Sequence, residues 1–260
     1  MKYRYQRPHP SLTDYIRTVL VLESFAEPDA EQLPLFTNGI PALLCETEKD
    51  EKENETIIRL TLYGKSTPED CWSAIGNRTI IAYFFKPFTV ACLFNLSAAK
   101  LVKDPVELST WNPHQINALK TQLIYAQTTT QKVEALDNLL IYQLKQHKKE
   151  CEMIRLITDE IMYNPTTEIL SQVQEKLQIN ERSFQRLFKK YVGVTPNQYR
   201  RICQFQTSFN QLREKNFDKL TDIAYDNGFA DQSHFIRSFR EFTHTTPNDY
   251  LRSGLKEKNE

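Results

Sequence analysis

The sequence predicts an α+β protein with a β-rich N-terminal domain, a helical connector, and an all-α C-terminal domain. The C-terminal domain is expected to hold two helix-turn-helix units joined by a linker helix. Three observations lead to this prediction. Runs of β-formers separated by turn signals fill residues 1–110, apolar spacing of three and four residues begins near residue 112, and one stretch occurs twice near the C-terminus. We therefore expect domains at 1–110, 111–150 and 151–260.

The repeated stretch relates residues 181–201 to residues 234–252. The two copies share aromatic positions and a Thr-Pro-Asn triplet: Phe184, Phe188 and Tyr191 align with Phe235, Phe239 and Phe242, and Thr195-Pro196-Asn197 aligns with Thr246-Pro247-Asn248. Two copies are too few for a solenoid. The repeat therefore indicates a pair of related helical modules.

Composition limits the classes of protein to be considered. The chain has 260 residues and no formal net charge, so its overall electrostatics indicate no partner. Residues 181–201 differ, because they contain six Lys and Arg side chains and one acidic side chain, Glu181, which gives a net charge of 6 − 1 = +5. The five cysteines are scattered and odd in number, which predicts reduced thiols. Without a signal peptide or an apolar span, we expect a cytoplasmic protein.

In the N-terminal domain, we expect strands over 15–22, 40–45, 57–63 and 79–85, with a turn at 37–39 and a curled sheet or partial barrel as the result. The first of these segments could also begin as a short helix. Residues 47–55 carry so many charges that we expect a mobile surface loop. Trp72 and the aromatic residues at 83–85 either line a pocket or belong to the core.

The connector is predicted to contain two amphipathic helices. Asn112-Pro113 is typical of a helix start, and Val133, Leu136 and Leu140 recur at helical spacing in the second helix. The helices either cover the sheet or form a dimerisation surface, and both alternatives stay open. The charged residues 146–150 are expected to link to the C-terminal domain.

Each copy of the repeat follows a short predicted helix, over 167–177 and 218–226, and a tight turn. A short helix, a tight turn and a second helix with a polar start is the pattern of a helix-turn-helix unit. The helix between the units runs from Pro196 to about Lys215, which is about 30 Å. One turn of B-DNA is about 34 Å, so this spacing predicts two recognition helices over successive major-groove faces.

Residues 165–252 resemble the C-terminal module of the AraC/XylS family of transcription regulators. The strongest likeness lies in residues 223–240, IAYDNGFADQSHFIRSFR, followed by TPNDY at 246–250. Gln174 stands where the family usually has Ala, and Gln178 and His244 stand where it usually has Gly. These departures leave the fold as expected and put the local turn geometry in question. The N-terminal half weakly resembles the β-rich domains fused to such modules in bacterial regulators.

The resemblance implies that base edges are read from the start of each second helix, by Glu181, Arg182, Gln185, Arg186, Asp231, Gln232, Ser233, Ile236 and Arg237. Arg can bond guanine, Gln can bond adenine, and Ile can contact a thymine methyl group. Phosphate contacts are expected from Lys189, Lys190, Arg200, Arg201 and Arg240. The alternatives are that the arginines only brace the module, that the glutamines only face solvent, and that the phenylalanines are core.

We therefore expect a sequence-specific transcription regulator that binds double-stranded DNA and is no enzyme, with no catalytic residues, no metal site and no cofactor. The resemblance implies that its first domain binds a small-molecule effector or mediates homodimer formation. One alternative is a helical protein-protein adaptor. The other is a DNA-repair enzyme with an attached helix-turn-helix module, with Cys45, Cys71 or Cys92 as the nucleophile.

Overall fold

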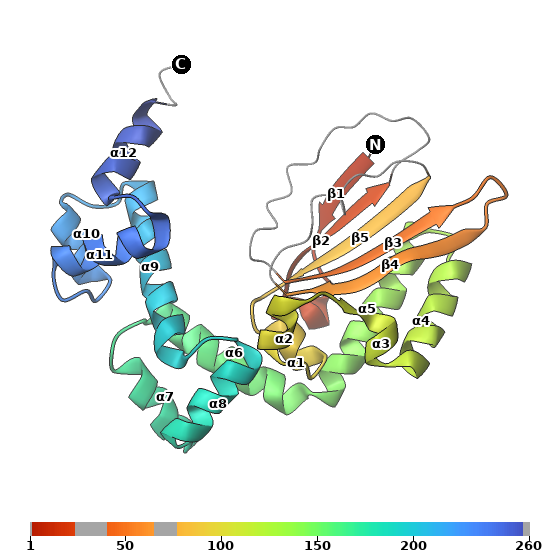
Figure 1. The fold of residues 1–260 in the computed structure, drawn as a ribbon, viewed down its shortest axis with the longest axis horizontal. Helices are drawn as coiled ribbons and strands as arrows, with labels where there is room; N and C mark the ends of the chain where they lie inside the picture. The colour runs from red at the N-terminus through yellow and green to blue at the C-terminus, as the bar shows by residue number, and fades with distance from the viewer. Residues whose placement is uncertain (1, 24–40, 65–76, 257–260) are drawn as a thin grey trace. The chain divides into compact units, whose positions relative to one another are not determined.

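The computed structural model describes residues 2–23, 41–64 and 77–256 (Figure 1). They divide into two compact units, one of Met1–Ile154 with Lys189–Gly193 and one of Arg155–Phe188 with Val194–Glu260. The first unit holds the sheet and the second is helical, which confirms the α+β class. The predicted boundaries at 110 and 150 stay predictions. The expected turn at 37–39, together with Cys71 and Trp72, lies outside the described residues.

The sheet of the first unit is antiparallel and has the strand order β1-β2-β5-β3-β4-β6. The strands are β1 (Lys2–Gln6), β2 (Ile16–Glu23), β3 (Ala42–Lys49), β4 (Glu55–Tyr63), β5 (Arg78–Phe85) and β6 (Val106–Glu107). Sequence patterns predicted β2 to β5 and missed the two edge strands. β1 alternates basic and aromatic residues and is exposed along most of its length, so it carries no apolar alternation. β6 has only two residues.

The charged segment 47–55 is not the surface loop that its composition predicts. β3 continues to Lys49 and β4 begins at Glu55, so only the tip of the hairpin is a turn. Thr47 and Glu55 are buried because Lys132 reaches both of them: its Nζ lies 2.9 Å from Thr47 Oγ1 and 2.5 Å from Glu55 Oε1. A cation from a distant helix therefore offsets the cost of burying the carboxylate.

Two long helices lie along one side of the sheet (Figure 1). They are α4 (Pro113–Tyr125) and α5 (Thr129–Gln146), and each starts with the expected cap: Asn112 accepts from Gln115 N, and Thr128 forms a capping box with Gln131. Tyr83 Oη of β5 donates to Asp137 of α5, at 2.9 Å. Val133, Leu136 and Leu140 of α5 are buried. This apolar stripe therefore serves as a cover inside the unit.

Shorter helices complete the first unit. The sequence analysis missed them, because the apolar pattern of residues 1–110 did not distinguish these short helices from strands. They are the 3-10 helix η1 (Pro10–Leu12), α1 (Thr89–Leu93), α2 (Ala98–Lys103) and α3 (Leu108–Trp111). The aromatic residues Tyr83, Phe84 and Phe85 are buried in the sheet core. No helix in the described ranges is long and apolar enough to cross a membrane.

The remaining helices follow the predicted pattern closely. They are α6 (Lys148–Tyr163), α7 (Ile169–Leu177), α8 (Glu181–Tyr191), α9 (Pro196–Glu214), α10 (Leu220–Asp226), α11 (Gln232–Thr243) and α12 (Pro247–Lys256). The charged segment 146–150, which was expected to be a linker, is helical except at His147, because α5 ends at Gln146 and α6 begins at Lys148. The division between the two units falls inside α6, after Ile154. Phe184, Phe188, Phe235 and Phe239 are fully buried, so the repeated phenylalanines form the core. Phe242 stacks on Phe205 with ring centroids 4.5 Å apart.

Candidate nucleic-acid interface

The second copy of the repeat forms a helix-turn-helix from α10 and α11. Gly228 has a φ of +70°, the left-handed conformation that glycine adopts without strain. Phe229 N then donates to Ala224 O at 2.8 Å, which closes the end of α10, and Asp231 caps α11 by accepting from His234 N at 2.7 Å. Phe235 and Phe239 anchor α11 to the core. The turn therefore sets where α11 begins.

The first copy forms the same motif from α7 and α8 without the usual glycine. Gln178 takes the left-handed conformation itself, with a φ of +51°, and Ile179 N donates to Gln174 O at 3.0 Å. Asn180 Oδ1 accepts from Ser183 N at 2.9 Å and thus caps the start of α8. The backbone hydrogen bonds at the end of α7 hold Gln178 in this conformation. A glutamine in place of glycine therefore strains the backbone at residue 178 but leaves the turn intact.

The helix α9 is bonded to both motifs. At one end, Phe188 of α8 packs against Tyr199 with ring centroids 5.7 Å apart. Further along, Gln204 Nε2 donates to the carbonyls of Asn227 and Gly228, at 3.0 and 2.9 Å, in the turn of the second motif. The helix has 19 residues and is therefore about 28 Å long. It can act as a spacer whose length is close to one turn of B-DNA, about 34 Å.

Arg200 has a different role from the phosphate contact expected of it. Its side chain donates to Pro165 O at 3.0 Å, to Asn197 Oδ1 at 3.2 Å and to Gln204 Oε1 at 3.3 Å. The residue is only 8% exposed, and burial lowers the pKa of its guanidinium. A cation enclosed in this way braces α9 against the segment between α6 and α7 and is not available to a phosphate. We therefore leave Arg200 out of the proposed interface.

Apart from Arg201, which lies on α9, the other expected contact residues lie on α8, on α11 or at the cap of α11. Those with exposed side chains are Glu181, Arg182, Arg186, Lys189, Lys190, Asp231, Ser233, Arg237 and Arg240. Those that are half-buried are Gln185, Arg201, Gln232 and Ile236. Arg201 forms an ion pair with Glu241, so part of its charge is already neutralised. The structure thus keeps arginines accessible from the first turn of α8 onward and, on α11, at Arg237 in the middle of the helix and Arg240 in its last turn.

One feature of this surface escaped the sequence analysis. Glu181, the first residue of α8, accepts hydrogen bonds from Gln174 on α7, at 2.7 Å, and from Gln185, at 2.6 Å. The contact between Glu181 and Gln185 has the spacing of neighbours on a helix face, which is a signal that the sequence contains. The contact with Gln174 depends on the angle between two helices and has no such signal.

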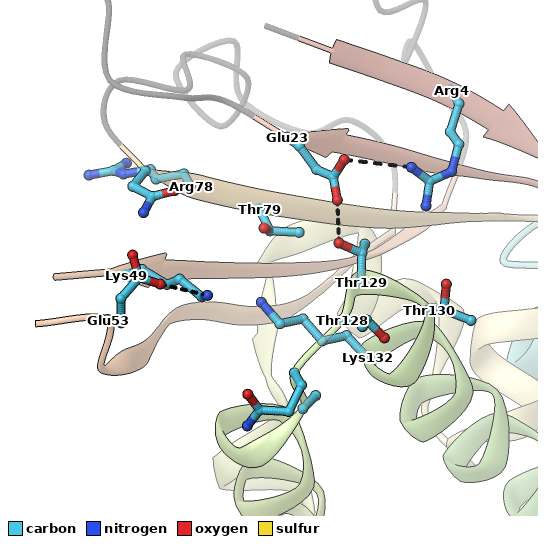
Figure 2. Close-up of a pocket in the computed structure, with 13 residues that line it drawn as sticks. Arg4, Glu23, Lys49, Glu53, Arg78, Thr79, Thr128, Thr129, Thr130 and Lys132 are labelled. Atoms are coloured by element: carbon cyan, nitrogen blue, oxygen red, sulfur yellow. Dashed lines mark hydrogen bonds and ion pairs between the residues drawn. The ribbon is translucent and has the colours of Figure 1, made fainter. Parts of the chain in front are cut away.

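The first unit contains a polar cavity of about 530 Å³ where β1, β2, β3 and β5 meet the start of α5 (Figure 2). Its charged side chains are largely matched: Arg4 lies 3.7 Å from Glu23, and Lys49 lies 2.9 Å from Glu53. Lys132 extends from α5 toward the strands (Figure 2). The cavity lining therefore has hydrogen-bonding groups of both kinds and more cations than anions, although Arg78 and Lys132 are paired with Glu48 and Glu55 outside the lining.

The cysteine thiols that the repair-enzyme alternative requires are poorly suited to that role where the structure describes them. Cys45 is 1% exposed, and burial raises its pKa to about 12. A hydrogen bond with Cys151 and burial raise the pKa of Cys92. Only the thiolate is nucleophilic, and both environments disfavour it.

Comparison with known proteins gives matches that centre on the second unit. The profile of a family described as "Helix-turn-helix domain" matches residues 174–253. The HTH-type transcriptional activator RhaS of Escherichia coli O139:H28 is 34% identical over 82 residues, which are 32% of this chain and 29% of RhaS. The uncharacterized transcriptional regulatory protein YesN of Bacillus subtilis is 28% identical over 102 residues, 39% of this chain and 27% of YesN. The chain thus spans less than a third of the length of these relatives.

Among solved structures, ToxT from Vibrio cholerae is 12% identical over 96% of each chain with a TM-score of 0.37. A probable AraC family transcriptional regulator from Rhodopseudomonas palustris is 21% identical, with a TM-score of 0.36 over 39% of this chain and 96% of that one. Scores at this level do not establish a shared fold.

Proposed function

We propose that this protein is a transcription regulator that binds double-stranded DNA at specific sequences. The premise is that residues 174–253 are a helix-turn-helix domain of the AraC/XylS type. One observation carries the proposal. Two helix-turn-helix motifs are bonded to a single continuous helix, and the second helix of each motif presents exposed arginines. A packed helical bundle needs neither the spacing nor the exposed cations.

Arg182 and Arg186 on α8, and Arg237 on α11, are the proposed guanine-reading residues. Guanidinium groups bond guanine in the major groove in a bidentate manner, and each such contact contributes about 1–3 kcal/mol of discrimination. Gln232, Ser233 and Ile236 complete the reading surface of α11. Asp231 is assigned to the helix cap, since its carboxylate already accepts from His234 N.

Lys189, Lys190, Arg201 and Arg240 are the proposed phosphate contacts. Such contacts position a protein on the duplex without reading sequence. They also release counterions, so the logarithm of the binding constant falls linearly with the logarithm of salt concentration, with a slope of about −0.9 for each phosphate neutralised. Replacing one of these residues by Ala should make the slope shallower by about one unit and weaken all duplexes alike.

Selection of bound duplexes from a random DNA library, followed by fluorescence anisotropy on the best site, tests the proposal. Arg182→Ala and Arg237→Ala should each weaken the best site by about 5- to 150-fold. Arg17→Ala is the matched control, because Arg17 is an exposed arginine on β2 of the other unit. If the library yields no enriched site, or if all three variants bind the best site equally well, the proposal is wrong.

The same proposal assigns the regulatory signal to the first unit. A small-molecule effector would find hydrogen-bonding groups in the cavity beside the start of α5, and a homodimer would place two DNA-binding units on one operator. Light scattering on the 30.5 kDa chain, with and without the selected duplex, measures the pairing. A change in DNA affinity on addition of a filtrate of small metabolites would support the effector, and an unchanged affinity would count against it.

A further inference from the structure

Glu181 stands out among the residues of the first motif because it is an acid at the start of a helix whose other charges are basic. It is the first residue of α8, its side chain is exposed, and Arg182, Arg186, Lys189 and Lys190 follow it. A carboxylate there is favoured by the helix dipole, and that alone would explain it. The dipole, however, does not require the two glutamines that hold the carboxylate.

Those glutamines restrain the carboxylate from two sides. Gln174 Nε2 on α7 donates to Glu181 Oε2 at 2.7 Å, and Gln185 Nε2 donates to Oε1 at 2.6 Å. Each oxygen thus accepts one bond, while an ionised carboxylate offers about four acceptor positions. The remaining positions stay open, and the side chain itself is exposed. The network leaves Glu181 as a held acceptor with spare capacity.

The position of Gln174 supports the interpretation that the Glu181 carboxylate is deliberately oriented. An alanine at residue 174 could not reach across the turn, so the bridge from α7 to α8 depends on the long amide side chain. Because the two helices are also joined through the bonded turn at Gln178, the amide is not needed to close the motif. Its bond orients a charged side chain on the proposed DNA-facing surface.

A fixed carboxylate can accept hydrogen bonds but cannot donate them, and this selects among bases. In the major groove cytosine presents the N4 amino donor, whereas guanine and thymine present acceptors. Adenine has an amino donor beside the N7 acceptor, which repels a carboxylate. Such a group also weakens binding to phosphates in general, so its contribution is to discrimination rather than to affinity.

We propose that Glu181 is a specificity-determining residue that selects cytosine at one position of the DNA site, with Gln174 and Gln185 as its positioning residues. This inference rests on the proposed function, since it presupposes that α8 enters a major groove. It also implies that Gln185 has one amide N–H engaged by Glu181, so its role is to orient the carboxylate rather than to read adenine.

Library selection with wild-type protein and three variants of the full chain tests the inference. Glu181→Gln keeps the size of the side chain and removes its charge. Gln174→Ala removes the bridge from α7. Glu175→Gln is the matched control, because Glu175 is an exposed acid next to Gln174 and its loss changes the net charge by the same amount.

Wild-type protein should enrich one C·G pair that it prefers by about tenfold over the other pairs at that position. Glu181→Gln should reduce this preference to less than about threefold while binding non-specific duplex more tightly, and Gln174→Ala should fall between the two. Glu175→Gln should keep the preference. An enriched site whose base frequencies are the same in Glu181→Gln would overturn the inference and leave the proposed function standing. Failure of the wild-type protein to enrich any site would instead overturn the proposed function.

Discussion

Gln204 offers a direct test of how the second motif is held on α9. Its side chain is 3% exposed, donates to the carbonyls of Asn227 and Gly228, and accepts from Arg200. Replacement by Leu keeps a side chain of similar size, so little cavity energy is expected. The change therefore isolates the hydrogen bonds between the linker helix and the turn.

The expected cost follows from the groups left without partners. An unsatisfied buried donor or acceptor costs about 1–3 kcal/mol, and three bonds are lost. Asn227 is half-buried and Gly228 is exposed, so water can replace part of what their carbonyls lose. We therefore expect a loss of about 2–3 kcal/mol. In a unit of about 100 residues, this lowers the melting temperature by roughly 10 °C or more.

Thermal denaturation and hydrogen exchange provide the measurement. Amide exchange in peptides from α10 and α11 should accelerate in Gln204→Leu, whereas peptides from the sheet should be unchanged, because the lost bonds lie in the second unit alone. Gln206→Leu is the matched control, since Gln206 is an exposed glutamine on the same helix. If the two variants lose equal stability, or if Gln204→Leu loses less than about 0.5 kcal/mol, the reasoning about this contact is wrong.

Three further predictions concern buried charge, backbone strain and pH. Lys132→Met should lower the free energy of unfolding, measured by urea denaturation, by about 3–5 kcal/mol because it leaves the buried Glu55 carboxylate without its cation. Adding Glu55→Gln should recover part of this loss, and equal stability of the single and double variants would contradict the prediction. His244→Gly should raise the melting temperature by a few degrees, because His244 has a φ of +59° and a left-handed residue with a side chain costs about 1 kcal/mol, whereas His244→Ala should not. Burial raises the pKa of Asp137, so the folded state holds this proton more tightly than the unfolded state does. The stability that Asp137 contributes is therefore present below its ordinary pKa of 3.8 and is lost as pH rises through the raised value. When unfolding is followed from about pH 4 to about pH 7, this loss of stability should be absent in Asp137→Asn.

Local patterns in the sequence were enough to predict most of the helical unit. Helix starts such as Thr195-Pro196 are specified by residues within one turn, and the structure has the capping box there, with Gln198 N bonded to Thr195 Oγ1. The buried phenylalanines follow from their spacing along each helix. The doubled stretch identified two related motifs for the same reason, because each motif is a local unit repeated in the chain.

The strands were predictable only where one face is apolar. β2 to β5 carry that signal, whereas β1 has none and is a strand only through its pairing with β2, the next strand along the chain. The charged hairpin shows the same limit. Lys132 bonds Thr47 across 85 positions of sequence, and without that partner burial of Glu55 would be too costly to predict.

The candidate interface divides along the same line. Amphipathic spacing placed the exposed arginines of α8 and α11 on the outer faces of their helices, and the sequence alone determined which residue types stand there. Only the tertiary structure could separate Arg200, enclosed by Pro165 and Gln204, from its exposed neighbours, or join Gln174 to Glu181. The physical reason is range: caps and helix faces are set within about four residues, whereas the burial or orientation of a charge depends on whichever group the fold brings beside it.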